Sequence, residues 1–76
     1  MPADMEVDMD QEILNLSIRK FLKTIGVNSQ REIEQAVAKA IEAKTIGAAE
    51  TLAASMTLRI GALQLEVRFD GDIHLQ

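Results

Sequence analysis

The sequence predicts an α+β fold in which two N-terminal helices pack on a three-stranded antiparallel β-meander. Two observations predict it. Apolar residues recur at helical spacing from Leu14 to Ile41, and they alternate with polar residues from Leu52 to Leu75. The period changes once, near residue 50. Helices followed by strands indicate a helical layer on one face of an antiparallel sheet.

The first helix is expected to begin after Asp10, whose carboxylate can accept hydrogen bonds from free amide groups at a helix start. Gly26 is expected to end it, because glycine readily takes the left-handed conformation of a C-terminal cap. The apolar stripe between these residues consists of Leu14, Ile18, Phe21, Leu22 and Ile25.

A second helix is expected to begin at Ser29, because Ser29 and Glu32 have the spacing of a capping box. Lys44 lies near its carbonyl end, where a cation is favoured. The short turn between the helices predicts an αα-hairpin. The buried face of the second helix is expected to contain Ile33, Val37, Ala40 and Ile41, with Ala36 beside them.

The strands begin with a predicted hairpin. Its first strand runs from Leu52 to Ile60, and Gly61-Ala62 fits a two-residue turn with glycine first. Such a turn keeps every apolar residue on one face and makes Arg59 and Glu66 diagonal neighbours on the other. The predicted pairs are Ile60 with Leu63, Leu58 with Leu65, and Met56 with Val67.

A third strand is expected after a loop of three residues, Asp70 to Asp72, which pairs Phe69 with Ile73. A two-residue Asp70-Gly71 loop would instead place Asp72 opposite Phe69 and put a carboxylate in the apolar layer. The longer loop is therefore preferred.

Size and composition limit the core. Seventy-six residues with two aromatic side chains and no cysteine allow one small domain with neither a disulfide framework nor a thiolate metal site. Dimerisation is the remaining common way to stabilise such a domain. Of the twelve acidic residues, five lie in the first twelve positions, which hold no Lys or Arg. We expect residues 1–10 to form an acidic, disordered tail and residues 11–76 a single α+β domain.

The acidic leader leaves three structural interpretations open: a frayed tail, a strand added to a sheet edge, or an extension of the first helix. A calcium-binding interpretation fails at the positions that need particular residues. With Asp4 as position 1 of an EF-hand loop, Met9 occupies the place of the glycine and Asn15 the place of the bidentate glutamate.

Ile13 and Leu16 fall on the polar side of the first helix, so the predicted core leaves them without a place. They are either solvent-exposed aliphatic residues or a contact with a partner protein or a second copy of the chain. The partner contact is the functional hypothesis for this pair.

A basic patch is predicted from four residues without an intervening acid: Arg19, Lys20, Lys23 and Arg31. With the predicted helix–turn–helix and the hairpin, it suggests a small winged-helix-like regulator that binds nucleic acid. The second helix, however, carries Glu32, Glu34 and Glu42, which oppose phosphate binding. Nucleic acid is therefore the less favoured partner.

The chain also resembles a known family through two stretches, IRKFLKTIGVNSQREIEQAV and MTLRIGALQLEVRFDGDIHL. The resemblance covers roughly Asn15 to Leu75. It is to a small family of uncharacterised, mostly proteobacterial proteins, grouped as a domain of unknown function. The resemblance implies a bacterial origin and carries no activity or site residues.

No catalytic group stands out. His74 is the single histidine, and its apolar neighbours Ile73 and Leu75 predict that it faces solvent. No serine has a recognisable partner base. We expect no enzymatic activity, no bound metal and no cofactor. The acidic leader does not resemble a secretion signal. The sequence predicts a cytoplasmic, non-enzymatic protein-interaction module, with homodimerisation as one mode of interaction.

Overall fold

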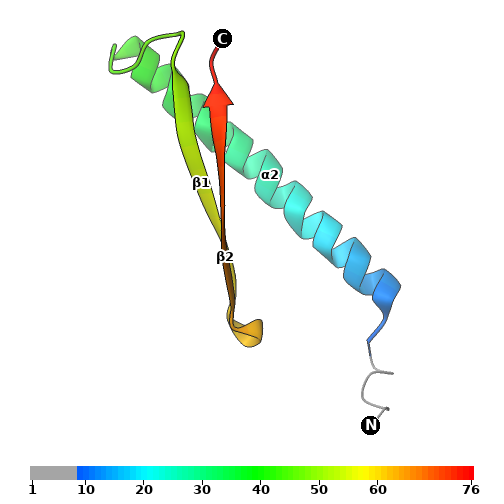
Figure 1. The fold of residues 1–76 in the computed structure, drawn as a ribbon. Coiled ribbons are helices and arrows are strands. Elements are labelled where there is room, and N and C mark those ends of the chain that lie inside the picture. Colours follow the sequence, from blue (N-terminus) through cyan, green and yellow to red (C-terminus); the bar gives the residue numbers. More distant parts are fainter. Residues whose placement is uncertain (1–8) are drawn as a thin grey trace. The chain divides into compact units, whose positions relative to one another are not determined.

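The computed structural model describes residues 9–76, which form one long helix and a two-stranded antiparallel hairpin (Figure 1). Helix α2 spans Gln11–Glu42, strand β1 Thr51–Ile60 and strand β2 Leu65–His74, with a 3₁₀ turn at Gly61–Leu63 between the strands. The chain divides into two compact units after Ala38. The fold is of the α+β class, but the prediction of two helices and a three-stranded meander is wrong.

The start of α2 is the one predicted. The Oδ1 atom of Asp10 accepts hydrogen bonds from the backbone amides of Glu12 at 2.9 Å and Ile13 at 3.2 Å. Its carbonyl accepts from the amide of Leu14 at 3.0 Å. Asp10 therefore satisfies amide groups that a helix start leaves without intrahelical partners.

The predicted turn at residues 26–29 is absent, and α2 continues through it. Gly26 does not have a positive φ, so it does not cap a helix, and Ser29 lies inside the helix instead of starting one. The apolar spacing explains why. The row that runs from Leu22 through Ile25, Ser29 and Ile33 to Ala36 advances by three or four residues at each step, so it continues across residues 26–29 without a break. Ile41, predicted on the buried face of the second helix, falls outside this row.

The end of α2 is a Schellman motif. The amide of Lys44 donates to the carbonyl of Ile41 at 3.0 Å, and the amide of Thr45 donates to that of Ala40 at 2.9 Å. Lys44 takes the left-handed conformation that this motif requires, with φ of 63°. A basic residue therefore does stand at the carbonyl end, and it supplies the cap through its backbone.

The connection to the hairpin is held by Gly47 and Glu50. The amide of Gly47 donates to the Glu50 carboxylate at 2.7 Å, and the Glu50 amide donates to the Gly47 carbonyl at 3.2 Å. This pair of bonds turns the chain into β1.

The first predicted strand is confirmed as β1, but the predicted pairing is shifted by two residues. Ile60 pairs with Leu65, Leu58 with Val67 and Met56 with Phe69. A shift of two residues keeps each apolar side chain on the same face, because side chains alternate with a period of two. Arg59 and Glu66 are directly opposite instead of diagonal, and their side chains form an exposed ion pair at 3.3 Å.

A longer loop causes this shift. The strands are joined by the four residues 61–64 and not by a two-residue Gly61-Ala62 turn. Gln64 closes the loop in the left-handed conformation, with φ of 52°, and its amide donates to the Gly61 carbonyl at 3.0 Å. The φ of Gly61 is not positive, so the conformation required of the first residue in a type II′ turn is absent.

The third strand is absent because β2 runs straight through Asp70, Gly71 and Asp72. Gly71 pairs with Ala54 and has no positive φ, so no turn forms there. Alternation explains the result. With Gly71 counted as a gap in the apolar row, residues 65–75 alternate without interruption, and Asp70 and Asp72 fall on the solvent-facing side.

Residues 9–76 contain no buried side chain. The half-buried residues of α2 are Ile25, Ser29, Val37 and Ala40, and those of the hairpin are Leu52, Ala54, Leu58, Leu65 and Ile73. Helix α2 and the hairpin each have an apolar face, and neither element encloses a core of its own within residues 9–76.

Candidate interaction surfaces

The main apolar stripe of α2 is a continuous surface along one side of the helix. Its large side chains are between 37% and 56% exposed, except for Ile25, which is half-buried. The stripe is broader than the seam of a simple coiled coil, because it includes residues at both three- and four-residue spacing. Its members are Leu14, Ile18, Phe21, Leu22, Ile25 and Ile33, followed by Ala36 and Ala40.

Ile13 and Leu16, the predicted partner contact, are 65% and 61% exposed. At 100° per residue they lie on the side of α2 opposite the main stripe. The continuous helix brings Val27 and Ile41 to the same side, with exposures of 48% and 41%. Sequence reasoning missed this second apolar row because it divided the helix at Gly26.

The four residues of the predicted basic patch are all exposed and belong to one helix. They lie within an arc of about 120° that also contains the second apolar row. The winged-helix interpretation required a helix–turn–helix, which α2 replaces with continuous helix. The binding of nucleic acid remains a prediction, and the helix–turn–helix that supported it is absent from residues 9–76.

The hairpin has one apolar face and one polar face. Leu52, Met56 and Leu58 of β1 lie opposite Ile73, Phe69 and Val67 of β2, and the central pair is the most exposed, with Met56 at 49% and Phe69 at 58%. Cross-strand pairs of this kind stabilise a sheet when another element covers them.

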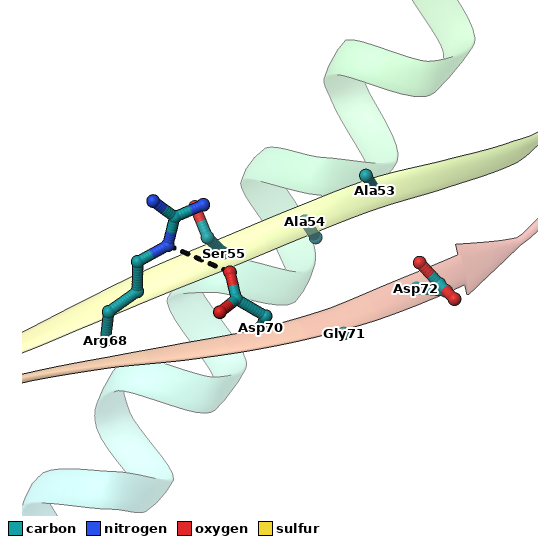
Figure 2. A pocket seen from close by; sticks show the side chains of 7 residues that line it. All are labelled: Ala53, Ala54, Ser55, Arg68, Asp70, Gly71 and Asp72. Carbon is teal, nitrogen blue, oxygen red and sulfur yellow. Dashed lines mark hydrogen bonds and ion pairs between the residues drawn. The ribbon is translucent and has the colours of Figure 1, made fainter.

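A hollow of about 360 Å³ lies at the middle of the hairpin, lined by Ala53, Ala54, Ser55, Arg68, Asp70, Gly71 and Asp72 (Figure 2). Two of the residues that line it, Ala54 and Gly71, are paired across the strands. Figure 2 shows the guanidinium of Arg68 directed at Asp70, and Nε and Oδ1 are 2.8 Å apart. Both side chains are about two-thirds exposed, so the pair contributes little to stability.

The residues that line the hollow include neither a histidine nor a cysteine. Its single serine, Ser55, does not hydrogen-bond to the ion pair. Over the stretch from residue 9 onward, no three side chains of the ligand types His, Cys, Asp or Glu come together as a metal site.

His74 faces solvent, as the alternation predicts. It lies at the end of the hairpin opposite Thr51, and its Nδ1 is 3.2 Å from the Thr51 hydroxyl oxygen. This contact joins the two strand ends and brings a threonine hydroxyl, a group that can act as a nucleophile, next to the imidazole. Within residues 9–76 no acidic group hydrogen-bonds to the imidazole to orient it.

Comparison with known proteins gives a family and nothing more specific. Neither the curated proteins nor the solved structures include a match to this chain. The structure itself has, among residues 9–76, no helix that is both long and apolar enough to cross a membrane. A family model described as a family of unknown function, DUF6494, matches residues 9–76. Since that match covers the whole described part of the chain, the protein belongs to this family of unknown function.

Proposed function

We propose that the protein is a non-enzymatic protein-interaction module that works as a homodimer. The observation that carries the proposal is the lack of any buried side chain in residues 9–76, despite extensive apolar surface. A hairpin of two strands is at best marginally stable in water, and most helices in proteins depend on packing of an apolar face. Both parts of this chain therefore need a surface that covers them.

A second copy of the chain is the surface that we assign to them. Seventy-six residues with two aromatic side chains and no cysteine offer neither a large core nor a disulfide, so dimerisation is the remaining common way to stabilise such a domain.

The two apolar rows of α2 support the same conclusion. The main stripe and the row of Ile13, Leu16, Val27 and Ile41 lie on opposite sides of one helix. One packed surface can cover only one side of a helix. An assembly with a second copy supplies further surface, and it assigns Ile13 and Leu16 the contact predicted for them. The bacterial, cytoplasmic setting expected from the sequence belongs to the same proposal.

Sedimentation of Phe21→Ala tests the proposal. Phe21 is 49% exposed on the main stripe, so truncating it removes little within one chain and much across an interface. Large aromatic residues of this kind contribute about 2 kcal/mol or more to association, so we expect the dissociation constant of the dimer to rise at least ~30-fold. Gln35→Ala, an exposed polar position of α2 that lies between the main stripe and the second apolar row, is the matched control and should change the constant less than about threefold.

Two results would contradict the proposal. One is a wild-type chain that sediments as a monomer at every concentration while its amide protons are dispersed and protected from exchange. The other is an equal effect of Phe21→Ala and Gln35→Ala, which would remove the main stripe from the interface.

A further inference from the structure

The two edges of the hairpin differ, and the difference indicates how two copies meet. Within residues 9–76 the sheet contains only β1 and β2, so each strand has one unpaired edge. The amide of Leu75 donates to the carbonyl of Glu50 at 3.4 Å, one residue beyond the pair Thr51 and His74. This bond sets the alternation of the antiparallel ladder.

The alternation determines which backbone groups are free. In β1 the residues with apolar-face side chains, Leu52 to Ile60 in steps of two, exchange hydrogen bonds with β2. The amides and carbonyls of the residues between them point away from β2: Thr51, Ala53, Ser55, Thr57 and Arg59. A strand added at this edge would hydrogen-bond to those five residues.

Charge distinguishes the two edges. Residues 51–58 of β1 carry no charged side chain, whereas the outward-pointing residues of β2 are Glu66, Arg68, Asp70, Asp72 and His74. Proteins commonly protect an exposed strand edge with charged residues. The β2 edge has this protection and the β1 edge does not.

Two-fold symmetry also disfavours the pairing of β2 with itself, although two of the registers bring Arg68 opposite Asp70 or Asp72. The backbone amides and carbonyls that point away from β1 must hydrogen-bond to the same kind of residue in the second copy. Only registers that place these residues opposite one another are therefore allowed. Each register that pairs more than half of β2 with itself then places like charges directly opposite. The clashes are Arg68 with Arg68, Glu66 with Asp72, Asp70 with Asp70, or Asp70 with Asp72.

The β1 edge is compatible with itself. With Ser55 at the two-fold axis, Ala53 lies opposite Thr57 of the second copy, and Arg59 lies opposite Thr51. On the apolar face the same register places Leu52 opposite Leu58. The neighbouring allowed registers also leave Arg59 opposite an uncharged residue. Paired residues in a sheet have their side chains on the same face. The register that satisfies the free backbone groups of β1 therefore also places apolar side chains opposite apolar ones.

We propose that two copies pair antiparallel through their β1 edges, which makes one four-stranded sheet of order β2, β1, β1, β2. The partner is a second copy of this chain, and the inference rests on the homodimer proposed above. The sheet that results has an apolar face about 19 Å wide and carries its charged strands at the outer edges.

Two proline substitutions on one rung of the hairpin test the pairing. Ala53 and Asp72 are opposite each other, and the amide of each points away from the partner strand, so neither proline removes a bond between β1 and β2. Ala53→Pro blocks the β1 edge in both copies and should raise the dissociation constant at least about tenfold, by loss of two symmetric hydrogen bonds. Asp72→Pro blocks the β2 edge and should change it less than about threefold.

The other outcomes overturn the pairing in distinguishable ways. A larger effect of Asp72→Pro would indicate the β2 edge, equal losses would indicate a head-to-tail contact of β1 with β2, and no effect of either would remove the sheet edges from the interface. A monomeric wild-type chain would instead remove the homodimer itself.

Spin labels give a second measurement that does not depend on how well proline is tolerated. The chain has no cysteine, so Ser55→Cys and Asp70→Cys, again on one rung, each provide a single labelling site. In the proposed dimer the distance between labels at residue 55 is shorter than the distance at residue 70 by about 10 Å, two strand spacings. The reverse order, or equal distances, would contradict β1 pairing.

Discussion

At the residue scale, the conformation of single residues decided between the predicted and the observed structure. Gly26, Ser29, Gly61 and Gly71 have the residue types of caps and turns, but no glycine in residues 9–76 has a positive φ. The positive values occur at Lys44 and Gln64, residue types that rarely adopt them. Glycine permits a turn without requiring one, so the surrounding apolar pattern determined the outcome.

Gly26→Ala tests this at the residue scale. Gly26 is inside α2, and a Cβ there would have no neighbour within 4 Å. Alanine is the better helix former, so we expect the free energy of unfolding to increase by about 0.5–1 kcal/mol. Urea denaturation at one fixed protein concentration measures it. If Gly26 instead capped a helix in the left-handed conformation, the same substitution would lower stability.

At the element scale, α2 and β2 each follow one periodic pattern of apolar residues. The cap and turn motifs within them predicted interruptions that the structure does not contain. Ser29 and Glu32 have the spacing of a capping box, but they lie inside α2. Ile25, Ser29 and Ile33 follow one another at intervals of four residues, so the helical period continues through them. In β2, Gly71 keeps its place in the apolar alternation opposite Ala54. Long-range periodicity outweighed short turn motifs in both elements.

The loop of the hairpin provides the test at this scale. Gln64 takes the left-handed conformation that closes the four-residue loop, with φ of 52°. Glycine adopts that conformation without the Cβ clash, so Gln64→Gly should stabilise the protein by about 0.5–1 kcal/mol. Thermal unfolding of the two proteins at equal concentration measures the change. With a two-residue Gly61-Ala62 turn, residue 64 would lie in a strand, and glycine there would destabilise it.

At the scale of the whole molecule, the proposed homodimer couples stability to association. The chain has no buried residue from Met9 onward, so a folded state that requires a second copy is stabilised by mass action.

We therefore expect the midpoint of thermal unfolding to rise with protein concentration, by about 4 °C for each tenfold increase in a dimer of this size. Circular dichroism melts over a hundredfold range of concentration provide the measurement. A midpoint independent of concentration, with reversible unfolding, would show that a single chain is stable alone.

Much of the local structure was predictable from the sequence. The change of period near residue 50, the Asp10 cap, the extent of β1, the solvent-facing His74 and the exposed Ile13 and Leu16 all follow from spacing and residue type. Spacing could not determine the number of helices and strands, because the same residues at 26–29 and 70–72 fit either a turn or a continuous element.

The sequence by itself determined which residues belong to helix and which to strand, and which side of each is apolar, because these depend on local periodicity. Only the tertiary structure decided that α2 is continuous, that Ile60 pairs with Leu65, and that no side chain of the described chain is buried. These depend on backbone conformation and long-range pairing, for which single residues provide weak signals. The uncovered apolar surface is the result that led to the proposed dimer.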